Sequence, residues 1–461
     1  MTENRSKTVH EHSGGGFWKA TKLYCRNKGG VITRGHADPL LCFVLGILIA
    51  AGLIGVYLAT LTSYGDSEFY KQLLYVAVSV VGMLLVSVVN YRVYEFPLAV
   101  VGTLLSVVLL LLTAAFGNDH NGTTRSLDFG AFQLQASEFA KAALILTLAC
   151  IFDRYYDQIT DCEPITTGFL ARIAAKVNNK LKCPFFNTSL WPIVGAGILV
   201  AAYAVLVNLG SHLSGFVIMG LIGFLMFSIS GVRKKWIVVC LLAGTLVIVG
   251  VFGYGHVKGY LGTSSDTTAA ETDDASSSTD SESAGGGLIK AYQYERLRIW
   301  LDKDDTSYTG SRAQTNTALA AITTGGFFGK GFGNSTLNSH LTECKNDFIF
   351  SIWVETFGFC GGIFLLLLFA VLIWRIAIIG VNCPDRYGSL LAFGIAFEFA
   401  IQVILHVAVN IDLFPNTGIS LPFFSSGGSS MLAYCLEIGV VLNLSKNMKY
   451  RKRILKSGDT K

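Results

Sequence analysis

The chain contains about ten apolar stretches that are long enough to cross a lipid bilayer. The hydrocarbon core of a bilayer is about 30 Å thick, and an α-helix needs roughly 20 apolar residues to span it. Because no water reaches the backbone there, each spanning segment must satisfy its peptide groups within its own helix. The sequence therefore predicts an all-α polytopic membrane protein. The predicted spans are residues 39–62, 71–90, 94–116, 137–152, 191–208, 210–230, 234–255, 348–376, 387–411 and 426–446.

The composition supports this class. Hydrophobic residues make up 52% of the 461-residue chain and charged residues 15%, whereas an ordinary soluble domain has about 25% charged residues. The first 38 residues contain no apolar core, so the first span, and not a cleaved signal peptide, is expected to direct insertion.

The Lys and Arg residues beside the predicted spans alternate between the two sides of the membrane, as the positive-inside rule requires. Basic residues in the segment 1–38 place the N-terminus in the cytoplasm, and an even number of spans places the basic tail 448–461 there too. The first outside loop carries Asp66 and Glu68 instead. The predicted cytoplasmic loops hold Arg92, Arg154, Arg172, Lys176, Lys180, Lys182, Arg233, Lys234, Lys235, Arg375 and Arg386.

Two long hydrophilic segments interrupt the predicted transmembrane domain, residues 39–447. Residues 153–190 are expected to form a cytoplasmic loop with a basic stretch suited to the membrane surface. Residues 256–347 are expected to form a large extracellular loop between the seventh and eighth spans. Its first part, residues 262–287, is rich in Ser, Thr, Asp and Gly and predicts a disordered insertion.

Ionisable residues inside the spans are functional candidates, because a charge in hydrocarbon costs about 2.5–3.5 kcal/mol on insertion scales. Glu138 and Lys141 are three residues apart, so they share a helix face and are expected to pair. The spacing leaves open whether the pair is only structural or also borders a substrate cavity. Arg125, in the outside loop just upstream, is a second cation that with Lys141 would suit a diphosphate.

Another acid stands where the large outer segment meets the eighth span. Asp347 is followed at once by apolar residues, so a helix begins at or next to it. Spacing alone favours the interpretation that Asp347 caps this helix, since Asp is preferred at the N-cap. Glu355 lies two turns further on and needs a partner or a water-filled recess.

Residues 414–430 (FPNTGISLPFFSSGGSS) cannot form a continuous lipid-facing helix, because they contain two prolines and three glycines. They are expected to be buried in protein or to border an aqueous cavity near the outer face. Backbone N–H groups around Ser425, Gly427, Gly428 and Ser429, where the next helix starts, would suit anionic oxygens. A purely structural re-entrant turn fits the same residues.

Taken together, these segments resemble the SEDS family (shape, elongation, division and sporulation), the FtsW, RodA and SpoVE group of bacterial cell-wall polymerases. Pro415 to Ser430 is similar to the family signature P-x-T-G-[IL]-x-L-P-F-[IF]-S-[YS]-G-G-S-S, with Ser426 where Tyr is usual. Ala136 and Thr342 stand where the family has proline. Three further motifs follow the family's order, at Gln135 to Lys141, at Gln314 to Gly333, and at Glu343 to Phe350 with Glu355 and Gly358 after it.

The resemblance implies a peptidoglycan glycosyltransferase that polymerises lipid II at the outer face of the bacterial cytoplasmic membrane, in division or cell-shape maintenance. It implies that Asp347 is the general base, which takes a proton from the acceptor's 4-hydroxyl as that hydroxyl attacks the donor and inverts its anomeric carbon. Undecaprenyl diphosphate would leave. The residues expected to bind it are Arg125, Lys141, Arg296, Arg298 and neighbouring Glu138, with Glu343 and Glu355 in support and Mg²⁺ or Mn²⁺ as an assistant.

The implied partners are lipid II, the undecaprenyl-diphosphate-linked glycan, a class B penicillin-binding protein and membrane lipids, and no nucleic acid is expected. Two other classes of function stay open. A lipid II flippase or other transporter would suit intramembrane Glu138, Lys141 and Glu355, although matched broken helices of inverted repeats are not evident. A non-catalytic scaffold for a transpeptidase would make Asp347 dispensable.

Overall fold

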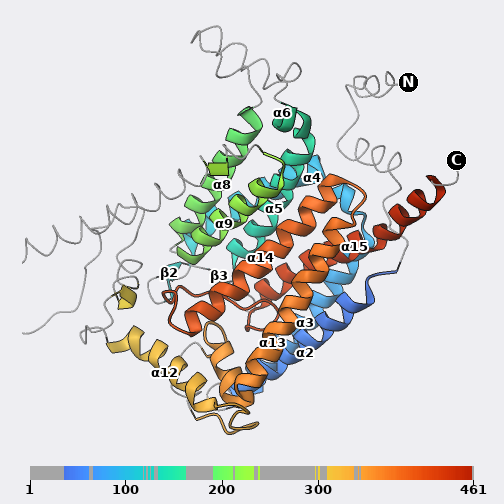
Figure 1. Cartoon of the computed structure of the whole chain (residues 1–461). Helices are drawn as coiled ribbons and strands as arrows, with labels where there is room; N and C mark the ends of the chain where they lie inside the picture. The colour runs from blue at the N-terminus through green and yellow to red at the C-terminus, as the bar shows by residue number, and fades with distance from the viewer. Residues whose placement is uncertain are drawn as a thin grey trace, which may run out of the picture.

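The structure is a computed structural model, a helical bundle with a further helix, α12 (Thr309–Gly325), and irregular segments at one end (Figure 1). Seven helices in its described residues are long and apolar enough to cross a membrane, which confirms a polytopic helical membrane protein. The predicted span 234–255 lies almost wholly outside the described residues, so the total of ten spans stays a prediction. The described residues are 36–61, 66–117, 119–120, 123–124, 126–128, 133–161, 190–210, 213–232, 237–238, 296, 299–301, 309–336, 341 and 344–458.

The other nine predicted spans each correspond to one helix. Most boundaries differ by a few residues, but the last helix continues to Gly458, well beyond the predicted end at residue 446. Shorter elements also occur: η1 (Tyr91–Tyr94), α6 (Tyr156–Asp161) and α12 (Thr309–Gly325). The nine helices are α2 (Pro39–Thr60), α3 (Asp66–Val88), α4 (Phe96–Phe116), α5 (Ala136–Arg154), α8 (Leu190–Leu209), α9 (Leu213–Ile229), α13 (Ile349–Val381), α14 (Arg386–Asn410) and α15 (Gly428–Gly458).

The outer segment between α4 and α5 contains two small antiparallel hairpins, which the prediction of an all-α chain did not include. In one, β1 (Asp119–His120) pairs with β2 (Thr123–Thr124). In the other, β3 (Leu127–Asp128) pairs with β4 (Gln133–Leu134). Strands of two residues are too short for an alternating apolar pattern, so the sequence gives no signal for them.

Local sequence fixes the start of two helices at the cytoplasmic end. Asp38 caps α2 by accepting a hydrogen bond from the Leu41 N–H at 3.1 Å, and Pro39 occupies the first turn, where no N–H is needed. Asp385 caps α14 by accepting from the Gly388 N–H at 3.4 Å. These caps satisfy N–H groups that would otherwise lack a partner near the membrane.

Contacts between distant segments support the predicted orientation, in which the start of the first span and the end of the last span lie on the same side of the membrane. The Asp38 N–H donates to Ser445 Oγ at 3.2 Å, so the start of α2 lies beside the cytoplasmic part of α15. Arg375, near the end of α13, forms an ion pair with Asp38. At the opposite end, the Cys344 thiol lies 3.6 Å from the Ala59 carbonyl.

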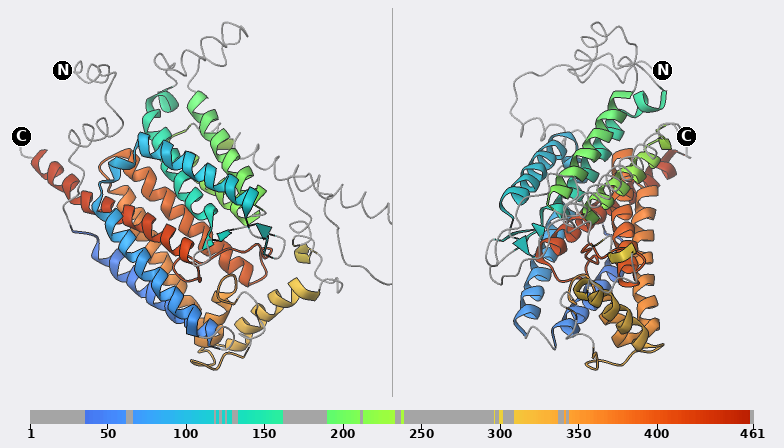
Figure 2. Two further views of the ribbon diagram at one scale, coloured as in Figure 1. Left: turned by 180° about the vertical axis from the view of Figure 1, so that it is seen from behind. Right: turned by 90° about the vertical axis from the view of Figure 1, so that its left-hand side faces the viewer.

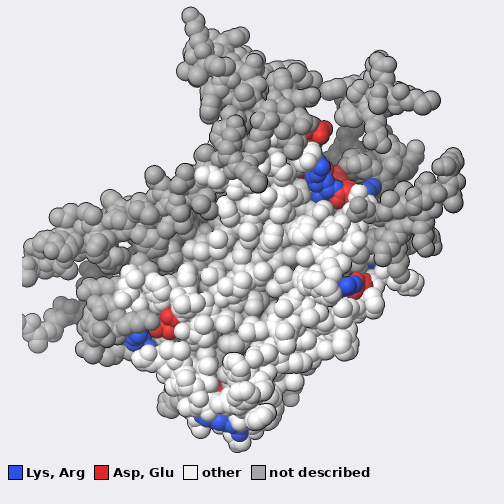
Figure 3. Space-filling view, in the orientation of Figure 1, with Lys and Arg blue, Asp and Glu red and all other residues white. Residues whose placement is uncertain are grey.

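Helices α14 and α15 form the centre of the bundle, and α3 and α4 lie at its periphery. Burial reaches 72% and 78% of the apolar windows of α14 and α15, but only 28% and 22% of those of α3 and α4. Seen from behind, α3 runs along α15 (Figure 2). Figure 3 shows one face that is white across its middle, with charged side chains gathered towards its ends. This distribution fits a surface that contacts lipid.

Helix α13 is broken at Gly358, which has φ +70°. A side chain there would meet backbone, since an added Cβ would lie 2.3 Å from Gly329 N and 2.5 Å from the Phe327 carbonyl oxygen. The backbone groups freed by the break bond to the glycine loop, residues 325–333. Its bonds run from Phe359 N to Gly326 O, from Cys360 N to Phe327 O, from Lys330 N to Glu355 O and from Gly331 N to Thr356 O, at 2.9 to 3.1 Å.

The packing of α2 against the loop before α15 yields a test of the fold. A Cβ on Gly52 would lie 2.2 Å from the Phe423 carbonyl oxygen, whereas one on Gly46, in the same helix, meets nothing within 4 Å. Gly52→Ala should therefore cost about 1–3 kcal/mol by overpacking and lower the thermal unfolding temperature of the detergent-solubilised protein. Gly46→Ala should be neutral or slightly stabilising, because Ala favours helix. Equal effects of the two substitutions would contradict this packing.

Candidate functional site

Asp347 lies at the outer end of the bundle, half-buried, in the turn that leads into α13. The N-cap of α13 is Phe348, which makes no side-chain capping bond. The interpretation of Asp347 as the helix cap is therefore wrong, because Asp347 precedes the cap by one residue. The backbone at this position is instead held by groups from other parts of the chain.

Asn410, the last residue of α14, connects Asp347 to the bundle. Its side-chain amide donates to the Asp347 carbonyl oxygen and to the His406 carbonyl oxygen, both at 2.9 Å. Its side-chain oxygen accepts from Ser351 twice, from the N–H at 3.2 Å and from the hydroxyl at 2.6 Å. Asn410 is fully buried. Its amide thus uses both donors and both acceptor positions to join the end of α14 to the start of α13.

The signature loop, residues 415–427, lies against the same turn from the other side. The Ser425 hydroxyl donates to the Asn346 carbonyl oxygen at 2.9 Å and accepts from the Leu421 N–H at 2.8 Å. The Ser426 N–H donates to the Lys345 carbonyl oxygen at 2.9 Å. The loop is largely buried, as the sequence predicts for a segment that cannot be a lipid-facing helix.

The end of the signature loop is tied to α3 and α5. The Gly427 N–H donates to Gln72 Oε1 at 3.2 Å. Ser429 accepts a hydrogen bond from the Gln135 N–H at 3.1 Å, and Gly428 is the first residue of α15. The anion-binding role of Ser425, Gly427, Gly428 and Ser429 stays a prediction, and in this structure Ser425, Gly427 and Ser429 bond to protein groups.

Glu138 and Lys141 form the predicted ion pair, with Lys141 Nζ 2.8 Å from Glu138 Oε2. The same ammonium lies 3.2 Å from Glu398 Oε1, a third group that spacing did not point to. Glu138 and Lys141 also line a narrow cavity, the polar cavity, whose lining residues are mostly polar. That this cavity binds substrate stays a prediction. The other polar residues lining this cavity include Gln135, Ser137, Gln402 and Ser420.

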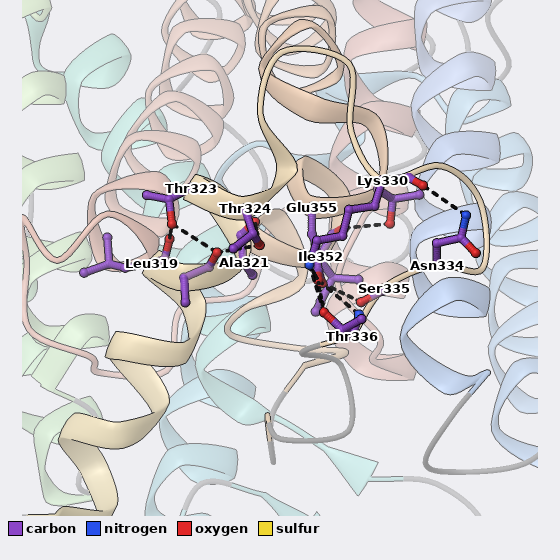
Figure 4. A network of polar contacts seen from close by, with 12 residues as sticks. Leu319, Ala321, Thr323, Thr324, Lys330, Asn334, Ser335, Thr336, Ile352 and Glu355 are labelled. Atoms are coloured by element: carbon purple, nitrogen blue, oxygen red, sulfur yellow. Dashed lines mark hydrogen bonds and ion pairs between the residues drawn. The ribbon is translucent and has the colours of Figure 1, made fainter.

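Glu355, which lies in an apolar helix and needs a partner, forms an ion pair with Lys330 (Figure 4). Its carboxylate lies 2.6 Å from Lys330 Nζ, in the glycine loop, and accepts from the Thr336 N–H at 3.1 Å and from the Ser335 hydroxyl. The glycines let this loop approach α13 closely enough for Lys330 to reach. The network holds the loop to the outer half of α13, which begins next to Asp347.

The other predicted site residues are placed only in part. Arg296 Nη1 donates to the Asn416 carbonyl oxygen at 3.3 Å, so this guanidinium lies beside the signature loop. Arg125, Arg298 and Glu343 lie outside the described residues, and their predicted roles stay predictions.

Within the described part of the chain, no group of three His, Cys, Asp or Glu side chains could hold a metal ion. Mg²⁺ is commonly held by substrate phosphates together with one or two carboxylates. The divalent cation therefore remains an expectation from the chemistry of the leaving group.

These features define a polytopic membrane protein with a candidate active site at the outer end of its helical bundle. Residues 38–450 match the model of the FtsW/RodA/SpoVE family, described as cell cycle protein. The chain therefore belongs to this family, the SEDS proteins.

Individual relatives and solved structures agree. Stage V sporulation protein E of Bacillus subtilis is 30% identical over 423 residues, which cover 90% of this chain and 98% of that protein. A protein of Coxiella burnetii named probable peptidoglycan glycosyltransferase FtsW is 29% identical over 342 residues, 73% of this chain and 74% of that one.

Two solved structures share the fold. A chain from a peptidoglycan synthase complex that coordinates polymerization and crosslinking has a TM-score of 0.60 at 22% identity, covering 89% of this chain and 98% of that one. Rod shape determining protein RodA of Thermus thermophilus has a TM-score of 0.55 at 21% identity, covering 89% of this chain and 97% of that one.

The Glu355 network generates a test. Lys330→Met should leave the Glu355 carboxylate buried without its cation and destabilise the protein by about 1–3 kcal/mol. The double variant Lys330→Met/Glu355→Gln should recover part of that loss, because the uncompensated charge is gone. Lys71→Met is the matched control, since Lys71 is a mostly exposed partner of Glu68 and should cost little. Thermal unfolding in detergent measures all three, and no recovery in the double variant would contradict a charge-based effect.

Proposed function

We propose that this chain is a peptidoglycan glycosyltransferase that polymerises lipid II into glycan strands at the outer face of the cytoplasmic membrane. The observation that carries the proposal is the position of Asp347. Its half-buried carboxylate stands at the outer end of the bundle, in a turn fixed by Asn410 and Ser425. The family of the chain and the names of its FtsW relatives support the reaction.

In this mechanism Asp347 acts as the general base. The 4-hydroxyl of the acceptor sugar loses its proton to the carboxylate while its oxygen attacks the anomeric carbon of the donor. The bond from that carbon to the diphosphate breaks, and the diphosphate leaves with the bonding electrons. Direct displacement inverts the anomeric centre and converts an α-linked diphosphate into a β-linked glycan. A positioned base typically contributes 10²–10⁴-fold to such a step.

The leaving diphosphate needs positive charge more than it needs a proton. We propose Arg296 for this role. Its hydrogen bond to the signature loop, which also packs on the Asp347 turn, supports the proposal. Lys141 lines the polar cavity, but it already shares its ammonium between two carboxylates. Arg125 and Arg298 are proposed as further ligands on the sequence motif alone, and Mg²⁺ or Mn²⁺ would supply additional charge when bound.

The proposed partners follow from the same chemistry. Lipid II and the growing glycan carry polyprenyl tails, and these tails need apolar surface open to the bilayer. The poorly buried faces of α3 and α4 offer such surface. A class B penicillin-binding protein is the proposed protein partner, supported by the likeness of fold to a chain of a peptidoglycan synthase complex.

Asp347→Asn should lower the rate of lipid II polymerisation by about 10²–10⁴-fold, because the amide cannot accept the proton. Purified protein in liposomes, with and without Mg²⁺ and the partner, would be assayed for glycan strands by gel electrophoresis. Asp128→Asn is the matched control, since Asp128 is an exposed carboxylate in the outer segment before α5. Its activity should stay near that of the wild type.

Full polymerisation by a folded Asp347→Asn protein would refute the assignment of the base. Transfer of labelled lipid II across the vesicle membrane without polymer, by the wild type, would instead favour a transporter. Retained binding of the penicillin-binding protein, with no polymer from the wild type under any condition, would favour a scaffold.

A further inference from the structure

A cluster of four ionisable side chains lies in the interior of the bundle, away from the Asp347 turn. Glu138 and Lys141 come from α5, Glu398 from α14 and Glu437 from α15. The ammonium of Lys141 lies between Glu138 and Glu398, at 2.8 and 3.2 Å. We call these four residues the carboxyl cluster. It contains three acids and one base.

Glu437 is the member of the cluster that no described donor reaches. Its side chain is 4% exposed, and both of its carboxyl oxygens lack a hydrogen-bond donor among the described residues. Oε2 of the fully buried Glu398 also lacks one. Glu398 and Glu437 are close enough to act on each other electrostatically. Two ionised carboxylates can only accept hydrogen bonds and repel each other, so a hydrogen on one of them is needed to join the pair.

No other charged side chain of the neighbouring described helices compensates the cluster. Helices α2, α4 and α9 contain none. The charged residues of α13 are used elsewhere, Glu355 by Lys330 and Arg375 by Asp38. In α3, Glu68 pairs with lysines near the outer surface. Fully ionised, the cluster would bury a charge of −2 in the membrane interior, at a cost of several kcal/mol.

A line of hydrogen bonds connects the cluster to the polar cavity. Gln402 Nε2 donates to Glu398 Oε1 at 2.9 Å, and Gln402 Oε1 accepts from the Tyr434 hydroxyl at 2.7 Å. The Tyr434 hydroxyl lies 2.9 Å from Ser420 Oγ, and Ser420 and Gln402 both line the cavity. The buried carboxyl groups are thus linked to the polar cavity through N–H and O–H groups whose hydrogens are exchangeable.

We propose that Glu398 and Glu437 form a proton-binding site in the membrane interior, with one proton held between their carboxyl groups. The proton enters from water in the cavity and makes the net charge of the carboxyl cluster less negative by one. This site is separate from Asp347 and takes no part in the proposed glycosyl transfer.

Infrared spectroscopy of the reconstituted protein at neutral pH tests the proposal directly. A protonated carboxyl group has a carbonyl stretch that a carboxylate lacks and that shifts in D₂O. The wild-type spectrum minus that of Glu437→Gln, and minus that of Glu398→Gln, should each contain this band. Glu355→Gln is the matched control and should give no such band, because Lys330, Ser335 and Thr336 hold Glu355 ionised. Absence of the band from both difference spectra would overturn the proposal.

Chemical labelling of the wild-type protein is a second test that needs no substitution. It distinguishes a bound proton from a bound Na⁺. Dicyclohexylcarbodiimide reacts with protonated carboxyl groups in apolar surroundings, so mass spectrometry should find adducts at Glu437 or Glu398, fewer at higher pH. The yield should be equal in sodium chloride and choline chloride of the same ionic strength. Protection by sodium alone would mean that the site holds Na⁺ in place of the proton, and would overturn the proposal.

Discussion

The candidate site depends on one buried amide, that of Asn410, and on the hydrogen bonds it makes to two chain segments at once. A buried amide that lost any of these partners would leave an unsatisfied group, at a cost of about 1–3 kcal/mol. The bonds therefore fix the Asp347 backbone relative to α14 and α13. The signature loop closes the other side of the same turn through Ser425. A carboxylate on a turn held from both sides is positioned before any substrate arrives, which is what general-base catalysis requires.

The membrane sets the second constraint. Backbone that is not helical is tolerated at membrane depth only where other protein groups satisfy it. The break at Gly358 meets this condition because the glycine loop supplies the missing bonds, and Lys330 of that loop neutralises Glu355. The signature loop meets it through Gln72 and the Asp347 turn. Both irregular segments thus lie near the outer end of the bundle and support the same site, while the carboxyl cluster lies deeper between α5, α14 and α15.

Much of this arrangement could be predicted from local patterns. Apolar runs located nine helices, charge alternation gave their direction, and the i, i+3 spacing gave the Glu138–Lys141 pair. The motif around Asp347 directed attention to the turn that Asn410 and Ser425 hold, although the cap interpretation was wrong. What could not be predicted were partners distant in sequence: Asn410, 63 residues from Asp347, Lys330 for Glu355, and Glu398 for Lys141. Such pairs depend on how helices pack, and the glutamates in α14 and α15 were visible only as isolated charges in apolar runs.

The most direct test of the account is turnover by Asn410→Ala at saturating lipid II, measured in the wild-type and the Asp347→Asn backgrounds with unfolding temperatures as a control. The account predicts a loss of about 10–100-fold in the wild-type background, because displacement of a catalytic group by about 1 Å can cost that much. It predicts little further loss in the Asp347→Asn background, where no base remains to be positioned. Unchanged turnover by folded Asn410→Ala, or an equal loss in both backgrounds, would contradict the claim that this amide positions the catalytic carboxylate.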